Sequence, residues 1–441
     1  MKAKNDKKTI WAWCMFDWAN QSYNMVITST IFPAYYVGIT ANTVYGKNTV
    51  SFFGHKYINT VLQNYILSIS YLLIVVSLPI LTSLADYRGA KKTYLQLFTW
   101  VGSLACAGLF FLEEGGPVEF GMICFGLATI GYCGGFVFYN SYLPQIASFD
   151  KQNDVSAKGF IYGFAGSIVV QLVCLVAVLF HESFHITENR GAQIAFIIVG
   201  LWWIGFAIIP FRLLPKGEPN IGSHKFNVWT GGFKELAKVF QNIRHMPLVK
   251  RFLPAFFFYS VGVQTIMLVA AEFAAKELHM KDDDLITIIL IIQVVAILGA
   301  WLTSMASNKY GNTRALIVLV IIWTITCLCV YYVANQTQFY MAAFAVGLVM
   351  GGVQSLSRST YAKFLPQDIP DTASYFSFYD ATEKLSIVVG MACFGFVESV
   401  TNEMRDSALV LDGFFFIGLL LLFVLHFYER KIPVQVEVAM A

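Results

Sequence analysis

The first apolar stretch of the chain carries a row of polar side chains that could bind a solute. Asp17, Asn20, Gln21, Asn24 and Thr28 are spaced so that all five share one face of an α-helix. Inside a bilayer this face must point toward protein or water, because polar groups facing lipid are expensive. Two interpretations stay open: hydrogen bonds between packed helices, or the wall of a water-filled cavity. We favour the cavity, because the row reaches the bilayer midplane near Asn24.

Asp17 and Arg358 have the clearest chemistry for a small charged solute. An aspartate within a span can bind an amine or a proton, or be a structural carboxylate held by hydrogen bonds. Arg358 can bind a carboxylate through two parallel hydrogen bonds, act as a gate, or extend to the membrane surface. Gln354, one turn before it, and Gln264 in another apolar stretch add polar candidates. An amine site combined with a carboxylate site would suit an amino acid.

A second charged cluster lies in the eleventh apolar stretch. Asp380 and Lys384 are four residues apart, acid first, which is the favourable order for an ion pair along a helix. We expect that pair to be structural. Glu383 has no partner at helical spacing, which makes it a candidate for proton coupling beside Asp17.

A short motif favours a different chemistry. His181, Glu182 and His185 match the zinc-protease pattern, in which two histidines one turn apart bind zinc and the glutamate acts as a base. The motif lies where an apolar stretch ends, and no third ligand is evident nearby. We therefore expect no enzyme activity and no cofactor or metal, and keep an intramembrane zinc protease as an alternative.

The elements that must position these residues are membrane spans. Hydrophobic residues make up 57% of the 441 residues, charged residues 13%, and the mean hydropathy is +0.62, so the solvent of this chain is lipid. A helix of roughly 20 residues crosses the bilayer. The sequence predicts an all-α membrane protein with twelve such helices, near 10–38, 61–84, 92–112, 118–146, 158–180, 191–214, 249–275, 284–307, 314–334, 338–361, 374–397 and 409–428.

The polar stretch between the two sets of six spans divides the chain. We predict a first six-helix bundle over 1–214, a cytoplasmic linker over 215–247 and a second bundle over 248–441. Within the linker, Phe233, Leu236, Val239, Phe240 and Ile243 recur at helical spacing among basic residues, which predicts an amphipathic helix on the membrane surface.

Orientation follows from the lysines and arginines. Of these 30 residues, 23 fall on the side of the N-terminus and linker, six fall in the opposite loops, and Lys384 lies within a span. Because positive loops stay in the cytoplasm, we predict a multi-pass protein with both termini cytoplasmic, in the inner or plasma membrane if the chain is bacterial.

The two sets of six spans are similar in sequence at corresponding positions. The loop after the second span reads Asp86-Tyr87-Arg88-Gly89, and the loop after the eighth reads Asn308-Lys309-Tyr310-Gly311. Paired glycines recur in the fourth and tenth spans. Two similar six-helix halves are typical of transporters that alternate access around a central site.

Several segments resemble a known family. Phe16-Asp17-Trp18-Ala19-Asn20, the later Ile31-Phe32-Pro33, Phe138-Tyr139-Asn140 and the run from Gly352 to Ser359 are similar to motifs of the autophagy-related vacuolar effluxer family, a branch of the major facilitator superfamily. The resemblance runs along the whole chain. It implies two pseudo-symmetric six-helix bundles with a central cavity lined by spans one, four, seven and ten.

The resemblance also implies roles for individual residues. Tyr139 and Asn140 join the candidate binding residues, and a gating motif is formed by Asp86, Arg88, Gly89, Asn308 and Gly311. The best-described members of the family export amino acids from the fungal vacuole. The chain departs from the family pattern at Gln21-Ser22, at Val261, where an acidic residue is expected, and at Asn308, where the loop carries no carboxylate.

Together these features predict a secondary transporter that moves a small polar or amphipathic solute by alternating access, with proton coupling. Amino acids are the leading class. Alternatives are a transporter of a sugar, drug or peptide fragment, the zinc protease, and a non-transporting sensor or lipid-handling protein. Expected partners are a small-molecule substrate, protons and the lipid bilayer. The net charge of +3 gives no reason to expect nucleic acid, and we expect a monomer.

Overall fold

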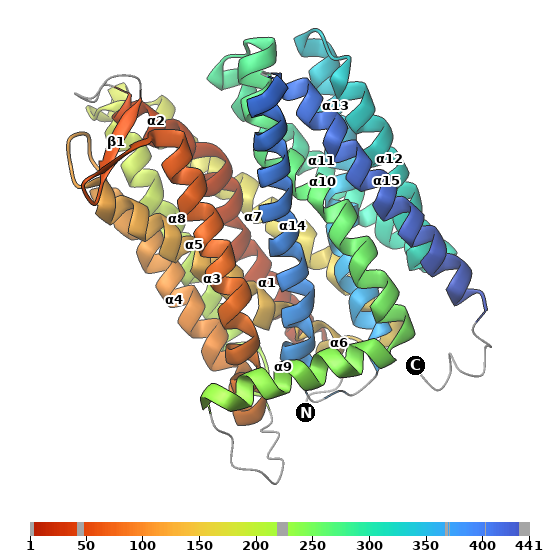
Figure 1. The fold of residues 1–441 in the computed structure, drawn as a ribbon. Helices are drawn as coiled ribbons and strands as arrows, with labels where there is room; N and C mark the ends of the chain where they lie inside the picture. The colour runs from red at the N-terminus through yellow and green to blue at the C-terminus, as the bar shows by residue number, and fades with distance from the viewer. Residues whose placement is uncertain are drawn as a thin grey trace.

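The computed structural model describes residues 4–41, 48–217, 228–366, 369, 371–401 and 403–431. Nearly all of this chain is helical, and eleven helices are long and apolar enough to cross a membrane. The first span comes in addition to these eleven, because it is built from three consecutive helical segments. The prediction of an all-α membrane protein is confirmed (Figure 1).

Each half of the fold contributes six spans. The first half contains α1 (Lys7–Ser22), η1 (Tyr23–Ile31), α2 (Phe32–Thr40), α3 (Asn59–Arg88), α4 (Lys91–Gly108), η2 (Leu109–Phe111), α5 (Val118–Asn140), α6 (Leu143–Ile146), η3 (Phe149–Lys151), α7 (Gln152–Leu179), η4 (His181–Phe184) and α8 (Glu188–Leu213). After α9 (Val228–His245), the second half contains α10 (Pro247–Leu278), α11 (Asp282–Tyr310), α12 (Asn312–Tyr331), α13 (Gln336–Phe364), α14 (Thr372–Thr401) and α15 (Met404–Glu429). The predicted spans agree with these helices.

The first span is interrupted by a π-helical segment. Asp6 caps its start by accepting a hydrogen bond from the backbone of Thr9 at 3.0 Å. In η1 the Ser29 hydroxyl donates to the Asn24 carbonyl at 3.0 Å, five residues back, as the wider π turn requires. Because the turn is wider, α-helical spacing no longer predicts which side chains share the face of Asn24. Thr28, predicted on that face, is buried elsewhere, and Ser29 takes its place.

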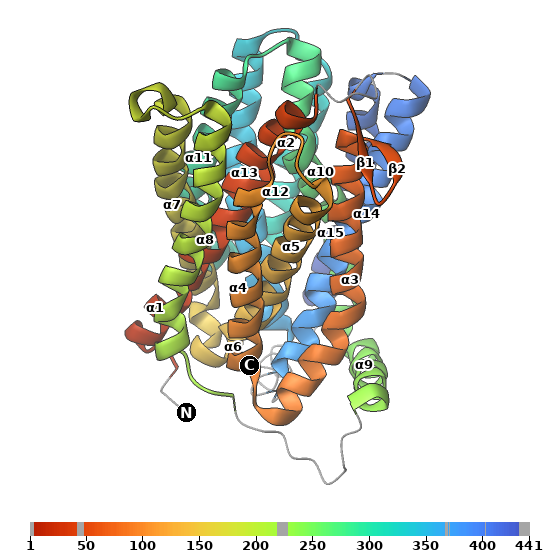
Figure 2. The same cartoon turned by 90° about the vertical axis from the view of Figure 1, so that its left-hand side faces the viewer.

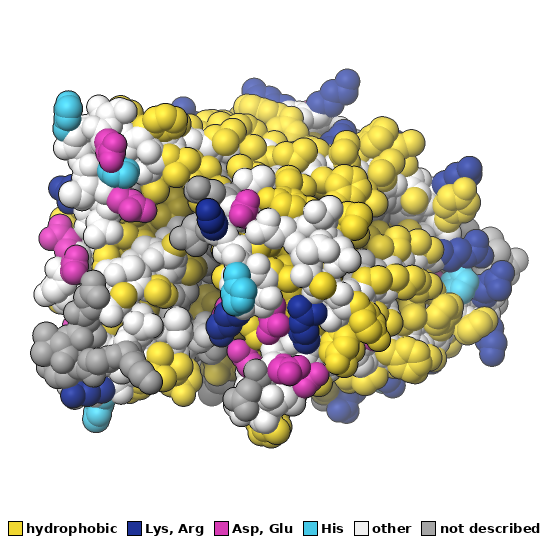
Figure 3. Space-filling view, turned by 90° about the horizontal axis from the view of Figure 1, so that it is seen from above, with side chains coloured by type: hydrophobic (Ala, Val, Ile, Leu, Met, Phe, Trp, Pro, Cys, Tyr) yellow, Lys and Arg dark blue, Asp and Glu magenta, His cyan; other side chains and the backbone are white. Residues whose placement is uncertain are grey.

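The two ends of the helix bundle differ. One end carries α9 and both termini, and we call it the α9 end (Figure 1). The opposite end carries a hairpin of β1 (Thr49–Phe52) and β2 (His55–Ile58), which the sequence did not predict, and we call it the hairpin end (Figure 2). The hairpin is held to the first half where the Phe53 backbone donates to Glu119 Oε1 at 3.1 Å. Seen from this end, charged and histidine side chains lie among wide areas of hydrophobic surface (Figure 3).

Small residues let the helices approach closely. A Cβ built on Gly131 of α5 would lie 2.4 Å from the Cα of Gly102 in α4, and one on Gly351 of α13 would lie 2.3 Å from the Ala296 carbonyl oxygen in α11. Neither distance is possible for a real side chain. These contacts between neighbouring spans therefore require glycine, as close packing in membranes commonly does.

α9 crosses the end of the bundle beneath both halves (Figures 1 and 2). It contacts α3 of the first half and α14 and α10 of the second. Val239 and Ile243 are buried, Phe240 is exposed, and Asn242 donates to the Tyr375 hydroxyl at 3.1 Å. The predicted amphipathic helix is therefore present, although the side chains of Phe233 and Leu236 lie outside the described part. The bundle boundaries at 214 and 248 stay predictions.

Candidate functional site

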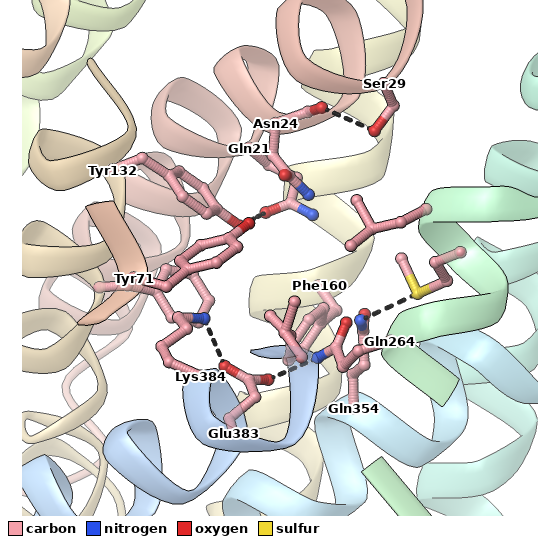
Figure 4. Close-up of a pocket in the computed structure, with 14 residues that line it drawn as sticks. Gln21, Asn24, Ser29, Tyr71, Tyr132, Phe160, Gln264, Gln354, Glu383 and Lys384 are labelled. Carbon is pink, nitrogen blue, oxygen red and sulfur yellow. Dashed lines mark hydrogen bonds and ion pairs between the residues drawn. The ribbon is translucent and has the colours of Figure 1, made fainter. Parts of the chain in front are cut away.

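A polar cavity lies between the two halves, near the middle of the spans (Figure 4). It contains about 600 Å³ of empty space, part of it open to solvent. Its wall combines polar and apolar side chains from α1, η1, α3, α5, α7, α10, α13 and α14: Gln21, Asn24, Ser29, Tyr71, Tyr132, Phe136, Phe160, Gln264, Met267, Leu268, Gln354, Glu383, Lys384 and Ile387. Four of the predicted binding residues, Gln21, Asn24, Gln264 and Gln354, are among them.

An ion pair forms the charged part of this wall. The Lys384 ammonium lies 2.6 Å from Glu383 Oε2, and Gln264 Nε2 donates to Glu383 Oε1 at 2.8 Å. The predicted pair of Lys384 with Asp380 is therefore wrong, and Glu383 does have local partners. Both charged side chains are almost buried, with 7% and 13% of the Lys384 and Glu383 side chains exposed. The cavity thus presents a positive and a negative group side by side.

The opposite wall comes from the first half. Figure 4 shows Gln21, Asn24 and Tyr132 on the other side of the space from Glu383, and Tyr71 next to Lys384. The Tyr132 hydroxyl donates to Gln21 Oε1 at 3.2 Å, which orients the amide. Because Gln21 and Asn24 line this space, part of the polar row on the first span faces a cavity rather than a dry contact between helices.

Gln354 is a lining residue with spare hydrogen-bonding capacity. Its Nε2 lies 3.5 Å from the sulfur of Met267, which is a weak acceptor. Its Oε1 is buried and has no hydrogen-bond partner among the described residues. A buried carbonyl oxygen left unpaired costs free energy, so this amide is available to a solute or water that enters the cavity.

Arg358 lies beyond one wall of the cavity, behind the ring of Phe160. Its guanidinium carbon is 4.4 Å from the centre of that ring and 4.8 Å from the ring of Trp13. Nε and Nη2 donate to the hydroxyl and carbonyl oxygens of Ser156 at 2.9 and 2.7 Å. Phe160 lines the cavity and also packs on Arg358, so it separates the solute space from the guanidinium.

Asp17 and Arg358 pair with each other across the two halves. Arg358 Nη1 is 3.5 Å from Asp17 Oδ2 and 3.2 Å from Asn140 Oδ1, and the Tyr139 hydroxyl donates to Asp17. The Asp17 and Arg358 side chains are 2% and 1% exposed. We call Asp17, Tyr139, Asn140, Ser156 and Arg358 the Arg358 cluster. Its four predicted binding residues lie outside the cavity wall and join the first half to α13.

Asn20, the remaining predicted binding residue, is fully buried and does not line the cavity. Its amide nitrogen and oxygen have no hydrogen-bond partner among the described residues. The polar row on the first span therefore divides. Asp17 belongs to the Arg358 cluster, Asn20 and Thr28 are buried away from the cavity, and Gln21 and Asn24 line it.

Asp86 of the predicted gating motif joins the two halves at the α9 end. Its Oδ2 accepts hydrogen bonds from the backbone and hydroxyl of Ser374, both at 2.8 Å, and its Oδ1 lies 3.1 Å from the Lys91 ammonium. Ser374 is in the first turn of α14, where the helix dipole also favours an anion. Lys91 in turn donates to Thr372 at 2.5 Å.

Two other motif residues shape the turn that carries Asp86. Gly89 adopts φ = +64° at the end of α3, a left-handed conformation that glycine allows without strain. Arg88 is exposed. The motif therefore combines a buried anion with a turn that brings Lys91 back toward it.

The second-half loop has a different chemistry. Asn308 accepts a hydrogen bond from Asn153 at 3.0 Å and donates one to Asp154 Oδ1 at 2.6 Å, and Ser304 also donates to Asp154 at 2.8 Å. Asp154 of α7, in the first half, thus provides the carboxylate that the loop lacks, and the side-chain amide of Asn308 donates a hydrogen bond to it. Gly311 has φ = +90°. Arg88 and Gly311 as gating residues stay predictions.

At the hairpin end, by contrast, each ion pair between described residues stays within one half. Arg190 lies 3.5 Å from Glu113 in the first half, and Lys276 lies 3.3 Å from Glu398 in the second. Among the described residues, most polar contacts that join the halves lie in the Arg358 cluster and at the α9 end, and we describe that end as sealed by them. The hydrogen bond from Gln293 to Gln171, at 2.7 Å, joins the halves nearer the hairpin end.

Among the residues that the structure describes, the zinc-protease motif has no third metal-binding side chain grouped with it. His181 to Phe184 make a short 3-10 turn at the hairpin end, and His181 Nδ1 lies 2.9 Å from the Val178 carbonyl oxygen. In the parts of the chain that the structure describes, no three His, Cys, Asp or Glu side chains are grouped to hold a metal ion.

The family is decided by a match along nearly the whole chain. Residues 5–432 fit the family described as vacuole effluxer Atg22 like. The chain belongs to this family. Among its relatives, the uncharacterized MFS-type transporter YxiO of Bacillus subtilis is 27% identical over 423 residues, which cover 93% of each chain. Autophagy-related protein 22 of Vanderwaltozyma polyspora is 24% identical over 369 residues, covering 73% of this chain and 69% of the relative.

Solved structures of major facilitator transporters share the fold of this Atg22-like chain. FucP in its outward conformation aligns with a TM-score of 0.68 and 13% identity, over 95% of this chain and 98% of FucP. The human organic anion transporter MFSD10 aligns with a TM-score of 0.71 and 10% identity, over 95% of this chain and all of that one. The predicted two-bundle major facilitator fold is confirmed, and family and fold together are those of secondary transporters.

Proposed function

We propose that this chain moves a zwitterionic solute, with amino acids the leading class, through the cavity between its halves. The observation that carries the proposal is the adjacent pair of Glu383 and Lys384 in the cavity wall. An ammonium can bind to the carboxylate of Glu383 while a carboxylate binds to Lys384, so one small zwitterion replaces the contact that the two side chains make with each other.

The rest of the wall suits the remaining parts of an amino acid. Gln21, Asn24 and Gln354 can hydrogen-bond the polar head group, and Gln354 already has an unpaired oxygen. Phe160 and Met267 offer apolar surface to a side chain. Asp17 and Arg358, which the sequence suggested as amine and carboxylate sites, are engaged with each other instead.

The contacts between the halves support alternating access. The α9 end is sealed by the pair of Arg358 with Asp17 and by the bonds of Asp86 with Ser374 and of Asp154 with Ser304, each of which joins the two halves. Rocking of one half against the other would break these bonds together and expose the cavity at that end. We place the α9 end in the cytoplasm, since the basic residues are concentrated there.

The test is counterflow of radiolabelled amino acids in proteoliposomes, with sugars as a comparison set. We expect exchange of one or more amino acids in the unmodified protein and at least a roughly tenfold loss in Lys384→Gln, which removes the cation. Lys276→Gln is the matched control, because Lys276 forms its ion pairs at the hairpin end, outside the cavity. Exchange of sugars but not amino acids, or unchanged amino-acid exchange in Lys384→Gln, would refute the proposal.

A further inference from the structure

The cavity wall, the Arg358 cluster and Asp380, which contacts Asn140 of that cluster, together hold more acids than bases. The acids are Asp17, Asp380 and Glu383, and the bases are Arg358 and Lys384. All five side chains are buried or nearly so, and all lie between the two halves or next to their contact. If every group were ionised, this set would carry one uncompensated negative charge in a medium where such a charge is very expensive.

Geometry identifies which acid is in excess. Arg358 contacts Asp17, and Lys384 contacts Glu383. Asp380 forms no ion pair with either cation among the described residues. Its Oδ1 accepts one hydrogen bond, from Asn140 Nδ2 at 3.2 Å, and its Oδ2 is buried without a hydrogen-bond partner in the described part of the chain. The whole residue is 1% exposed.

Asn140 links this acid to the Arg358 cluster. Its Oδ1 accepts from Arg358 Nη1 at 3.2 Å, while its Nδ2 donates to Asp380. The guanidinium can only donate, so Asn140 must turn its oxygen toward Arg358 and its amino group toward Asp380. Asp380 is thereby held in contact with the cluster, but from the described residues it receives a single, neutral hydrogen bond, which does not compensate a buried carboxylate.

We propose that Asp380 is the proton-binding residue of this transporter, and that sealing the α9 end requires a proton on it. Opening separates Asn140 and Asp17, in the first half, from Arg358 and Asp380, in the second. Arg358, which lies in the same half as Asp380, then loses its contact with the carboxylate of Asp17. The Asp380 O–H bond breaks, the proton passes to water at the α9 end, and the carboxylate that remains balances Arg358. This inference rests on the alternating access of the proposed function, not on the identity of the solute.

The surroundings leave few other groups that could bind this proton. Around Asp380 the titratable and charged side chains are Tyr379, Glu383 and Lys384 on its own helix, Cys133 on α5, and Arg358 and Tyr361 on α13. Tyrosine and cysteine are neutral at neutral pH. Glu383 has both a lysine and a glutamine as partners, so it does not share the position of Asp380.

Acid is expected to have opposite effects on the α9 end depending on whether Asp380 or another acid of the seal, Asp86 or Asp154, binds the proton. Asp86 and Asp154 hold the α9 end closed by accepting hydrogen bonds from Ser374, Ser304 and Asn308. A proton on either would weaken the seal, so acid would open the α9 end. A proton on Asp380 removes the uncompensated charge, so acid would close it.

The test measures opening directly, without a solute. Spin labels are placed on Thr93→Cys of α4 and Lys309→Cys of α11, which are exposed at the α9 end in different halves. Cys329 and Cys393 are changed to serine, because the other six cysteines are buried. Electron–electron distance measurements in nanodiscs from about pH 5 to about pH 9 should show the short, sealed distance gaining population as the pH falls.

Asp380→Asn keeps the neutral form permanently and should show the short distance at every pH. Asp412→Asn is the matched control, since Asp412 also lies within a span but in α15, outside the charge set, and it should keep the pH dependence. If Asp380→Asn does not fold, the smaller neutral Asp380→Ser is measured with the same expectations.

Three outcomes would overturn the inference: a distance that does not change with pH in the unmodified protein, opening at acid pH, or unchanged pH dependence after neutralisation of Asp380. The spin-label experiment adds no amino acid. If no amino acid were exchanged in the counterflow assay, the proposed solute class would be refuted, but the proposal for Asp380 would not be affected. Conversely, amino-acid counterflow combined with a pH-independent distance would support the transport proposal and exclude Asp380 as its proton site.

Discussion

The molecule contains two buried acid–base pairs that differ in how they are connected. Glu383 and Lys384 are neighbours on one helix and face the cavity, so they move together when the halves move. Asp17 and Arg358 come from opposite halves and are sealed from the cavity by Phe160. A pair within one half can open to a ligand without any movement of the bundle, whereas a pair across the halves breaks whenever the halves separate. The first therefore suits binding and the second suits gating.

The largest expected effect comes from removing the cation of the cross-half pair. Arg358→Ala leaves Asp17 buried without its partner, and breaking a buried pair in this way costs about 3–5 kcal/mol. We expect loss of the sealed state and of exchange, measured by the Thr93–Lys309 spin-label distance and by counterflow. Arg358→Lys should restore part of the seal, because it keeps the charge but not the forked geometry. A sealed distance in Arg358→Ala would mean that the pair does not gate.

A smaller effect is expected from a methyl group added beside the same pair. A Cβ on Gly159 would lie 2.6 Å from Asp17 Oδ2, 2.7 Å from the Tyr139 hydroxyl and 2.9 Å from Arg358 Nη2. Gly159→Ala should therefore loosen the cluster and lower exchange roughly tenfold. Gly205→Ala is the control, since a Cβ there meets no atom within 4 Å. Equal exchange in the two variants would show that the cluster tolerates displacement.

The second-half loop provides a test at the edge of the seal. Asn308→Asp would place a carboxylate against Asp154, where the amide now donates a hydrogen bond at 2.6 Å. We expect the sealed state to lose about 1 kcal/mol, a modest amount because both side chains are partly exposed. The double change Asn308→Asp with Asp154→Asn should recover the seal. Recovery would be absent if the loop acted independently of α7.

The smallest effect is expected within the cavity wall. Tyr132→Phe removes the hydrogen bond to Gln21 and should weaken solute binding by about 1 kcal/mol, or about fivefold in the half-saturation concentration. Tyr65→Phe is the control, because Tyr65 is exposed on the lipid-facing side of α3. A change in the maximal rate with unchanged half-saturation would instead place Tyr132 in the conformational step.

The spans could be predicted because lipid requires long apolar helices, and hydropathy reports length directly. The polar row on the first span was predicted only in part, since η1 changes the helical period after Ser22 and exchanges Thr28 for Ser29. The pair of Glu383 and Lys384 was missed, because adjacent residues on a helix do not normally face each other. Here two long side chains turn toward the same cavity.

Other parts of the site carry no local signal. Tyr71 and Tyr132 line the cavity, but aromatic residues are frequent in spans and their orientation depends on packing. The partnership of Asp17 with Arg358 joins residues 341 positions apart. Each residue could be recognised as functional by its charge within a span, whereas their mutual contact required the arrangement of the halves.

Among the described residues of the cavity wall, Phe160 is the one whose ring packs on the guanidinium of Arg358. The residues that we propose to bind the solute and those that we propose to close the α9 end are therefore almost separate sets, with the ring of Phe160 between them. Substitutions in the wall can then accumulate during evolution without damaging closure. Such a division would allow distant relatives to carry different molecules with the same closing machinery.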